Sequence, residues 1–287
     1  MNSGPRLRTA RSSAVTAAAV ILVIAWTAVS ASAQTEPPPD PREAKPERPT
    51  VATHAYAVAA GIVELEAGFQ WQRPEPGSSQ LGVPALVKIG LGKRVQLDIS
   101  PGWVRVGPDG HTESGFADTV VGVKWQIGED LPVLEDFAIQ PTIKLPTGSV
   151  ERGTGTGTTD LTITVISSRS LGPIGLDLNV AYTRRSGDGS HVPIDATLWT
   201  ISSAFPVKGP VAWTAELFGY PGTSGPAGSA PVVALLTGPT VTLQRSLVLD
   251  AGVIFNMTGF GGTAVYAGAT WNMGRIPWAT RTAVARK

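Results

Sequence analysis

Charged side chains recur at every second residue in several stretches of this 287-residue chain, as Glu64 and Glu66 do. In a β-strand every second side chain lies on the same face, so these charges would share one face of their strands. Carboxylates and ammonium groups that meet across an enclosed space could close it by ion pairing, or line a wet path that sorts solutes by charge. The residues expected to line this interior are Glu64, Glu66, Lys88, Asp98, Lys124, Gln140, Lys144, Glu216 and Asp250, with Asp118, Asp177 and Arg185 also inward or at the rim.

Three other groups of residues could suggest a phosphate-binding loop, a calcium site or a hydrolytic site. The first two lack residues that such a site needs. The glycine–threonine run 153–158 resembles a phosphate-binding loop but has neither the lysine nor the following helix. The turn 107–110 has a single carboxylate, which cannot supply the ligands of a calcium site. Asp188, Ser190 and His191 could form a hydrolytic group, although a loop histidine is ordinarily just exposed to solvent. We therefore predict no catalytic residue, no metal site and no cofactor.

The charged positions lie in segments whose hydropathy alternates with a period of two. Residues 63–72 alternate apolar and polar side chains, and the pattern recurs along the chain. Such alternation predicts strands with one apolar and one polar face, and helical periodicity is nearly absent beyond the N-terminal segment. We expect about twelve strands between Val58 and Met273. Segment 232–243 fits least well, because Leu235 and Leu236 are adjacent.

Two features favour a membrane barrel over a soluble β-sandwich. Short connections such as 206–210 alternate with long ones such as 146–160, as in barrels with tight periplasmic turns and longer outer loops. Aromatic residues on the apolar face fall near strand ends, where rings at the headgroup level form two girdles. The outer girdle is expected to contain Trp71, Trp103, Tyr182, Trp199 and Phe255, and the inner girdle Trp125, Phe137, Phe205, Trp213 and Trp271. The expected fold is an all-β, antiparallel, up-and-down transmembrane β-barrel.

The two ends of the chain have different compositions. Residues 1–33 combine three arginines, an apolar core and Ala31-Ser32-Ala33, which predicts a cleaved Sec signal peptide. Its removal leaves 20 basic and 22 acidic residues, and this formal charge of −2 argues against a nucleic-acid partner. Residues 34–57 mix prolines with charges, which favours a solvated, disordered periplasmic linker; an interaction arm or a lumen plug is the alternative. Residues 274–287 form a basic tail.

Several short motifs resemble an outer-membrane family labelled putative MetA-pathway of phenol degradation, often called simply transporter. The resemblance covers roughly residues 69–273 and is carried by the segments Asp118–Trp125, Ile143–Gly148, Glu216–Gly219 and Leu249–Val253. It implies a β-barrel with a role in the passage of small compounds, with aromatic or apolar ones among the candidates, and it brings no catalytic residues.

Together these observations predict a non-enzymatic pore in the bacterial outer membrane that passes small molecules passively. Its expected partners are the outer-membrane lipid, the barrel-assembly machinery and a small-molecule solute. Two other functions remain open. One is a barrel closed inside by salt bridges that acts through its long outer loops, as a structural or adhesive protein. The other is a lipid-acting barrel enzyme, which would need His191 in contact with a serine.

Overall fold

The computed structural model describes residues 40–108, 110–132, 134–187, 193–222, 224, 230–258 and 262–275, and these form fourteen β-strands. Among these residues, no helix has the length and hydropathy needed to cross a membrane. The predicted signal peptide lies outside the described residues, as does the basic tail beyond Arg275. The strands are β1 (Ile62–Gln72), β2 (Ser78–Gly90), β3 (Val95–Ser100), β4 (Gly102–Pro108), β5 (Glu113–Phe116), β6 (Thr119–Leu131), β7 (Glu135–Leu145), β8 (Asp160–Leu171), β9 (Ile174–Arg185), β10 (Asp195–Lys208), β11 (Val211–Tyr220), β12 (Val232–Gln244), β13 (Leu247–Asn256) and β14 (Ala264–Arg275).

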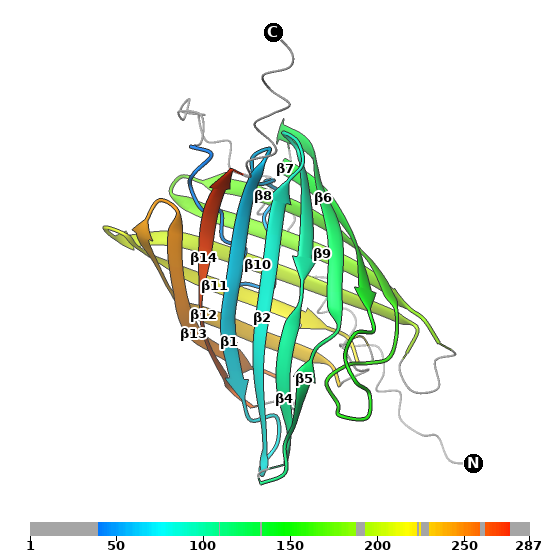
Figure 1. Ribbon diagram of the computed structural model, residues 1–287. Helices are drawn as coiled ribbons and strands as arrows, with labels where there is room; N and C mark the ends of the chain where they lie inside the picture. Colours follow the sequence, from blue (N-terminus) through cyan, green and yellow to red (C-terminus); the bar gives the residue numbers. More distant parts are fainter. Residues whose placement is uncertain are drawn as a thin grey trace, which may run out of the picture. The chain divides into compact units, whose positions relative to one another are not determined.

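The strands form one closed antiparallel barrel (Figure 1). β1 pairs with β14 on one side and with β2 on the other, which closes the sheet. β3 and β4 both pair with β2 and are separated by Pro101, which has no backbone N–H to continue a ladder. β5 and β6 are likewise two parts of one strand that breaks at residues 117–118. The fourteen segments therefore make twelve barrel strands, and the predicted fold is confirmed.

The two ends of the barrel differ in the length of their connections. At the turn end, where β1 begins and β14 ends, hairpins are as short as residues 172–173 and 209–210. Gly172 and Gly209 have φ of +60° and +56°, a conformation that glycine adopts without steric cost. At the opposite, loop end, connections reach the length of residues 146–159. The predicted alternation of short and long connections is present.

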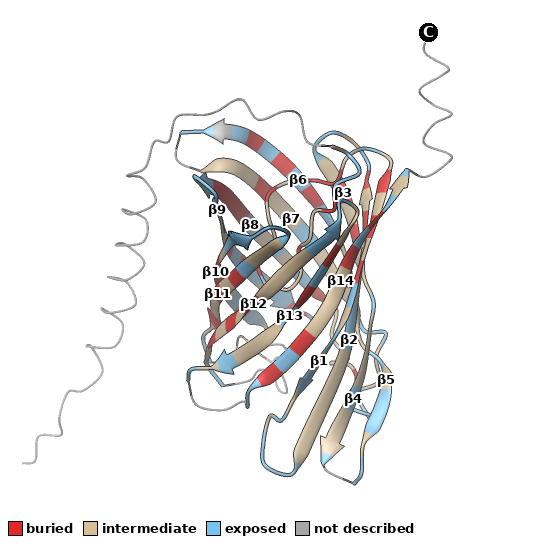
Figure 2. Cartoon of the chain, turned by 90° about the vertical axis from the view of Figure 1, so that its left-hand side faces the viewer, coloured by how far each residue is buried: buried red, intermediate tan, exposed pale blue. Residues whose placement is uncertain are grey.

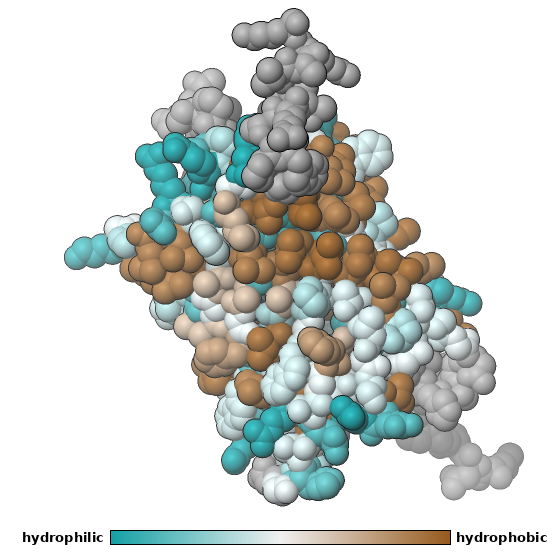
Figure 3. Space-filling model, viewed as in Figure 1, coloured by the Kyte–Doolittle hydropathy of each residue, from teal (hydrophilic) through white to brown (hydrophobic). Residues whose placement is uncertain are grey.

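Apolar side chains cover the outside of the barrel, and polar ones face inward. On β14, buried and exposed residues succeed one another as the two-residue period requires (Figure 2). Large apolar residues remain exposed on the outer face, including Trp125 at 56% and Trp271 at 46%. Figure 3 shows such residues across the middle of one face, with hydrophilic residues gathered at its lower, loop end. Water would disfavour a patch of this extent, whereas lipid would solvate it.

Most of residues 40–59 lies inside the barrel, with residues 41–43 exposed at the turn end, so the prediction of a solvated linker is wrong for the part inside. Ala52, Ala55 and Val58 are at most 2% exposed, and the segment contains no strand. The backbone N–H of Ala44 donates to Arg245 in a tight turn, and the N–H of Gly61 donates to Gly90 at the same end. The segment therefore enters and leaves the lumen at the turn end. We call residues 40–59 the plug.

Candidate functional site

The plug is held in the lumen mainly by hydrogen bonds from its backbone to wall side chains. The Glu66 carboxylate on β1 accepts the N–H groups of Glu47 at 2.8 Å and of Arg48 at 2.9 Å. Four strands further round the barrel, the Glu216 carboxylate on β11 accepts two further plug N–H groups, at 2.8 and 2.6 Å. Further plug N–H groups donate to wall side-chain oxygens: that of Lys45 to Glu64, Thr53 to Asn179, Ala55 to Ser168 and Val58 to Gln96.

The prolines of the plug fit this arrangement. Pro46 and Pro49 have no N–H, and they stand between the residues whose N–H groups the wall accepts. An extended chain makes no internal backbone ladder and leaves its N–H groups free for outside acceptors. A proline-rich and charged composition predicts a linker solvated by water. The same composition also suits a segment whose backbone N–H groups are bound by side chains of the barrel wall.

Two fully buried lysines balance the acidic groups of the lumen. Lys88 Nζ lies 3.2 Å from Glu64 Oε2 and 2.7 Å from Glu66 Oε1. Lys124 pairs with Glu47 of the plug, and its Nζ also donates to Thr53 Oγ1 at 2.8 Å. An isolated buried charge is costly, and Lys124 has its Glu47 counter-charge only while the plug is docked, whereas Lys88 is paired within the wall. The Lys124–Glu47 pair thus adds to the backbone bonds in holding the plug.

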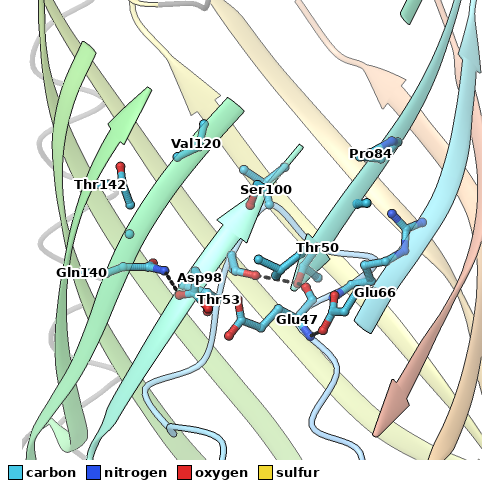
Figure 4. Close-up of a pocket in the computed structure, with 16 residues that line it drawn as sticks. Glu47, Thr50, Thr53, Glu66, Pro84, Asp98, Ser100, Val120, Gln140 and Thr142 are labelled. Carbon is cyan, nitrogen blue, oxygen red and sulfur yellow. Dashed lines mark hydrogen bonds between the residues drawn. The ribbon is translucent and has the colours of Figure 1, made fainter. Parts of the chain in front are cut away.

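Asp98 and Gln140 border a cavity of the lumen. Asp98 accepts hydrogen bonds of 2.7 Å from Gln96 and from Gln140. The cavity has a volume of about 300 Å³ and lies between the plug and strands β2, β3, β6 and β7 (Figure 4). A second cavity, of about 310 Å³, adjoins it at Pro84, Ala85 and Ser100. The plugged barrel thus retains room for small molecules.

Lys144 belongs to a cluster that holds the β7–β8 loop. Its Nζ lies 2.7 Å from Asp160 Oδ2 and 3.6 Å from Asp118 Oδ2. Asp118 accepts the N–H groups of Gly148 and Thr156 as well as the Thr156 hydroxyl. Burial by itself would raise the pKa of Asp118, but these donors outweigh it and the net pKa is lowered. This cluster fixes the loop against the barrel.

The predicted lumen residues therefore fall into four groups. Glu64, Glu66, Lys88 and Lys124 form the charged cluster around the first half of the plug. Glu216 and Asp250 bind the plug on other strands, Asp98 and Gln140 line the cavity, and Lys144 holds a loop. Whether all of them line a solute path stays a prediction. The ten residues expected in the girdles are all partly or well exposed, and their place at the headgroup level also stays a prediction.

Sequence reasoning gave a lumen plug only as an alternative for this segment, and it singled out neither the plug residues that bind the wall nor the neutral acceptors Gln96, Ser168 and Asn179. One signal could have found the plug. Leu236, whose position broke the alternation in segment 232–243, pairs with Glu216 and is 1% exposed on the inner face. Ala138 and Ile166 are inward too and cluster with Ala55 of the plug. Apolar residues at inward positions indicate that something other than water covers them.

The remaining candidate sites gain no support from the described residues. Asp188, Ser190 and His191 lie outside them. Within the described ranges, no group of three or more histidine or acidic side chains is arranged to hold a metal ion.

Comparisons with known proteins identify a family for the chain and a solved structure of similar architecture. A family model described as "Putative MetA-pathway of phenol degradation" matches residues 47–259. An outer-membrane channel from Pseudomonas putida F1 superposes with a TM-score of 0.58 at 12% identity, over 80% of this chain and 100% of that chain. The translocator domain of the autotransporter NalP from Neisseria meningitidis gives a TM-score of 0.42 at 9% identity, over 73% of this chain and 86% of that chain. No curated protein sequence matches the chain.

Proposed function

We propose that this chain, which belongs to the family described as "Putative MetA-pathway of phenol degradation", is a bacterial outer-membrane pore for the passive passage of small molecules. We further propose that the plug closes the pore and must move for it to conduct. The observation that carries the proposal is that the plug is bound to the wall by side-chain acceptors and ion pairs, while it pairs with no strand.

Movement of the plug would leave the barrel intact. The barrel closes through β1–β14 and β1–β2 pairing, to which the plug contributes nothing. Water can replace each bond to a wall side chain, whereas unpairing a strand would expose a row of backbone groups to lipid. Because the plug enters and leaves at the turn end, its central residues can withdraw toward that end as a loop.

The lumen also suggests which solutes pass. Without the plug, the wall carries more carboxylates than lysines, which disfavours anions. The cavity lining combines Gln140 and Thr142 with apolar Leu86 and Val120, which suits small molecules with both polar and apolar parts. The reference to phenol degradation in the family description is compatible with small aromatic compounds as solutes.

A reversible disulfide between plug and wall would test the gating step. The chain has no cysteine, and the Ala55 N–H donates to Ser168 Oγ at 2.8 Å, which brings the two backbones within disulfide reach. We expect the oxidised Ala55→Cys/Ser168→Cys protein to show almost no openings in planar bilayers, and reduction to restore wild-type conductance. Ala55→Cys alone is the control and should be insensitive to reductant. Equal conductance of the oxidised and reduced double variant would contradict a moving plug.

One observation favours a second function, that of a closed barrel acting through its loops. The cluster of Asp118, Lys144 and Thr156 gives the β7–β8 loop a fixed conformation, as a binding surface would require. The same bilayer experiment separates the two functions. A folded wild-type protein without conductance in planar bilayers, and without solute flux into liposomes, would leave the loop function standing.

A further inference from the structure

Arg48 binds the barrel wall in a manner that differs from the backbone contacts of the plug. Its Nη2 lies 3.1 Å from Asp250 Oδ1, and its Nε lies 3.3 Å from Asp250 Oδ2. The Arg48 side chain is 16% exposed and that of Asp250 is 3% exposed. Two parallel N–H···O bonds of this kind match a planar guanidinium to a carboxylate, and an ammonium group cannot reproduce them.

Two glycines make room for the guanidinium. Gly68 on β1 and Gly268 on β14 are register partners, and Gly268 also pairs with Asp250 on β13. A Cβ at Gly68 would lie 2.5 Å from Arg48 Nη2, and a Cβ at Gly268 would lie 2.5 Å from Arg48 Nε. At these two positions the wall therefore has no side chain that would contact the planar guanidinium group of Arg48. We call Gly68, Gly268 and Asp250 the cradle.

A buried hydroxyl adjoins the cradle. Tyr266 is 5% exposed, stands two residues before Gly268 on the inner face of β14, and pairs with Gly252. Among the described residues its hydroxyl has no hydrogen-bond partner. Buried hydroxyl groups ordinarily find one, so this group is a candidate to accept a further N–H from a bound molecule.

We propose that the cradle is a binding site for the guanidinium or amidinium group of a solute, and that Arg48 occupies it as an internal ligand while the plug is docked. The inference rests on the proposed function, because a solute gains access only when the plug moves. Withdrawal of Arg48 would leave Asp250 as a buried carboxylate without a counter-charge, which is costly. A planar cation of the solute restores the lost pair and its two-point geometry.

The test empties the cradle by mutation, so that it does not depend on conduction. Full-length Arg48→Ala protein in detergent is titrated with methylguanidinium and with methylammonium, and binding is followed by calorimetry. We expect methylguanidinium to bind at least about tenfold more tightly, a difference of about 1.4 kcal/mol. Wild-type protein, whose cradle is filled, should bind neither cation. Arg48→Ala/Asp250→Asn should lose the preference.

Equal binding of the two cations to Arg48→Ala, or a preference retained without the Asp250 carboxylate, would overturn the inference. If Arg48→Ala does not fold, its refolding yield is measured in each cation. Recovery in methylguanidinium but not in methylammonium then supports the site, and no recovery in either overturns it. Because these readouts need no ion flux, a failure here is distinct from a failure of the pore, which the disulfide experiment detects.

Discussion

At the scale of single residues, the lumen shows carboxylates that act as acceptors for a neighbouring chain rather than as a free charged lining. Glu66 and Glu216 each accept two plug N–H groups, and the Asp250 carboxylate is matched by Arg48. The sequence predicted these acids as inward residues because of their spacing. Their partners could not be predicted, because they come from a segment with no periodicity that would place it in the barrel.

Replacing Glu216 with Gln should loosen the plug. Glutamine offers one acceptor oxygen where the carboxylate offers two, and it has no charge, so at least one charged hydrogen bond of about 1.5 to 3 kcal/mol is lost. We expect the open fraction in single-channel recordings to rise about tenfold or more. Glu113→Gln, at an exposed position near the loop end, is the matched control and should leave gating unchanged. An unaltered open fraction in Glu216→Gln would argue against the role of this carboxylate in docking.

At the scale of elements, the alternating pattern predicted the strands well, since each strand is polar on one side and apolar on the other. It did not predict the interruptions that split two barrel strands, because the alternation continues on both sides of Pro101 and of residues 117–118. The β1–β14 seam likewise depends on a feature that hydropathy does not reveal. Gly68 and Gly268 face one another there and leave space for a side chain of the plug.

A methyl group in this seam should destabilise the protein. In Gly268→Ala the new Cβ would lie 2.5 Å from Arg48 Nε and 2.7 Å from the carbonyl oxygen of Ala67, and overpacking of this kind costs about 1 to 3 kcal/mol. We expect a lower midpoint in the heat-induced shift of gel mobility. Gly92→Ala introduces the same methyl group where no atom lies within 4 Å, and it should retain the wild-type midpoint. Matching midpoints for the two variants would refute the close packing.

At the scale of the whole molecule, the outer surface and the interior have exchanged the roles that they have in a soluble protein. Trp125 and Trp271 are well exposed outside, whereas Lys88 and Lys124 are fully buried inside. The sequence could predict this inversion, because the alternation of short and long connections and the aromatic residues near strand ends are both typical of membrane barrels. The choice between a filled and an open lumen could not be made from the sequence, because twelve strands are compatible with an open or an occupied interior.

Tryptophan fluorescence provides a test of this inversion. In liposomes with brominated acyl chains, the strand tryptophans should be strongly quenched, because bromine acts only at short range and these rings face outward. Trp125→Phe should reduce the quenched component, whereas Lys93→Gln in a turn should not change it. Tryptophan emission that stays unquenched, or a refolded chain that remains monomeric in plain buffer, would be incompatible with lipid contact.

The use of peptide N–H groups in plug docking has an evolutionary consequence. At Val51 and Ala52 the wall recognises a part of the chain that every amino acid except proline possesses. Relatives could therefore diverge at these positions and still close their pores, provided that the acceptor opposite them persists. The trace of such a closure in related sequences would be a conserved glutamate in the strand that corresponds to β11, with few shared residues in the segment it holds.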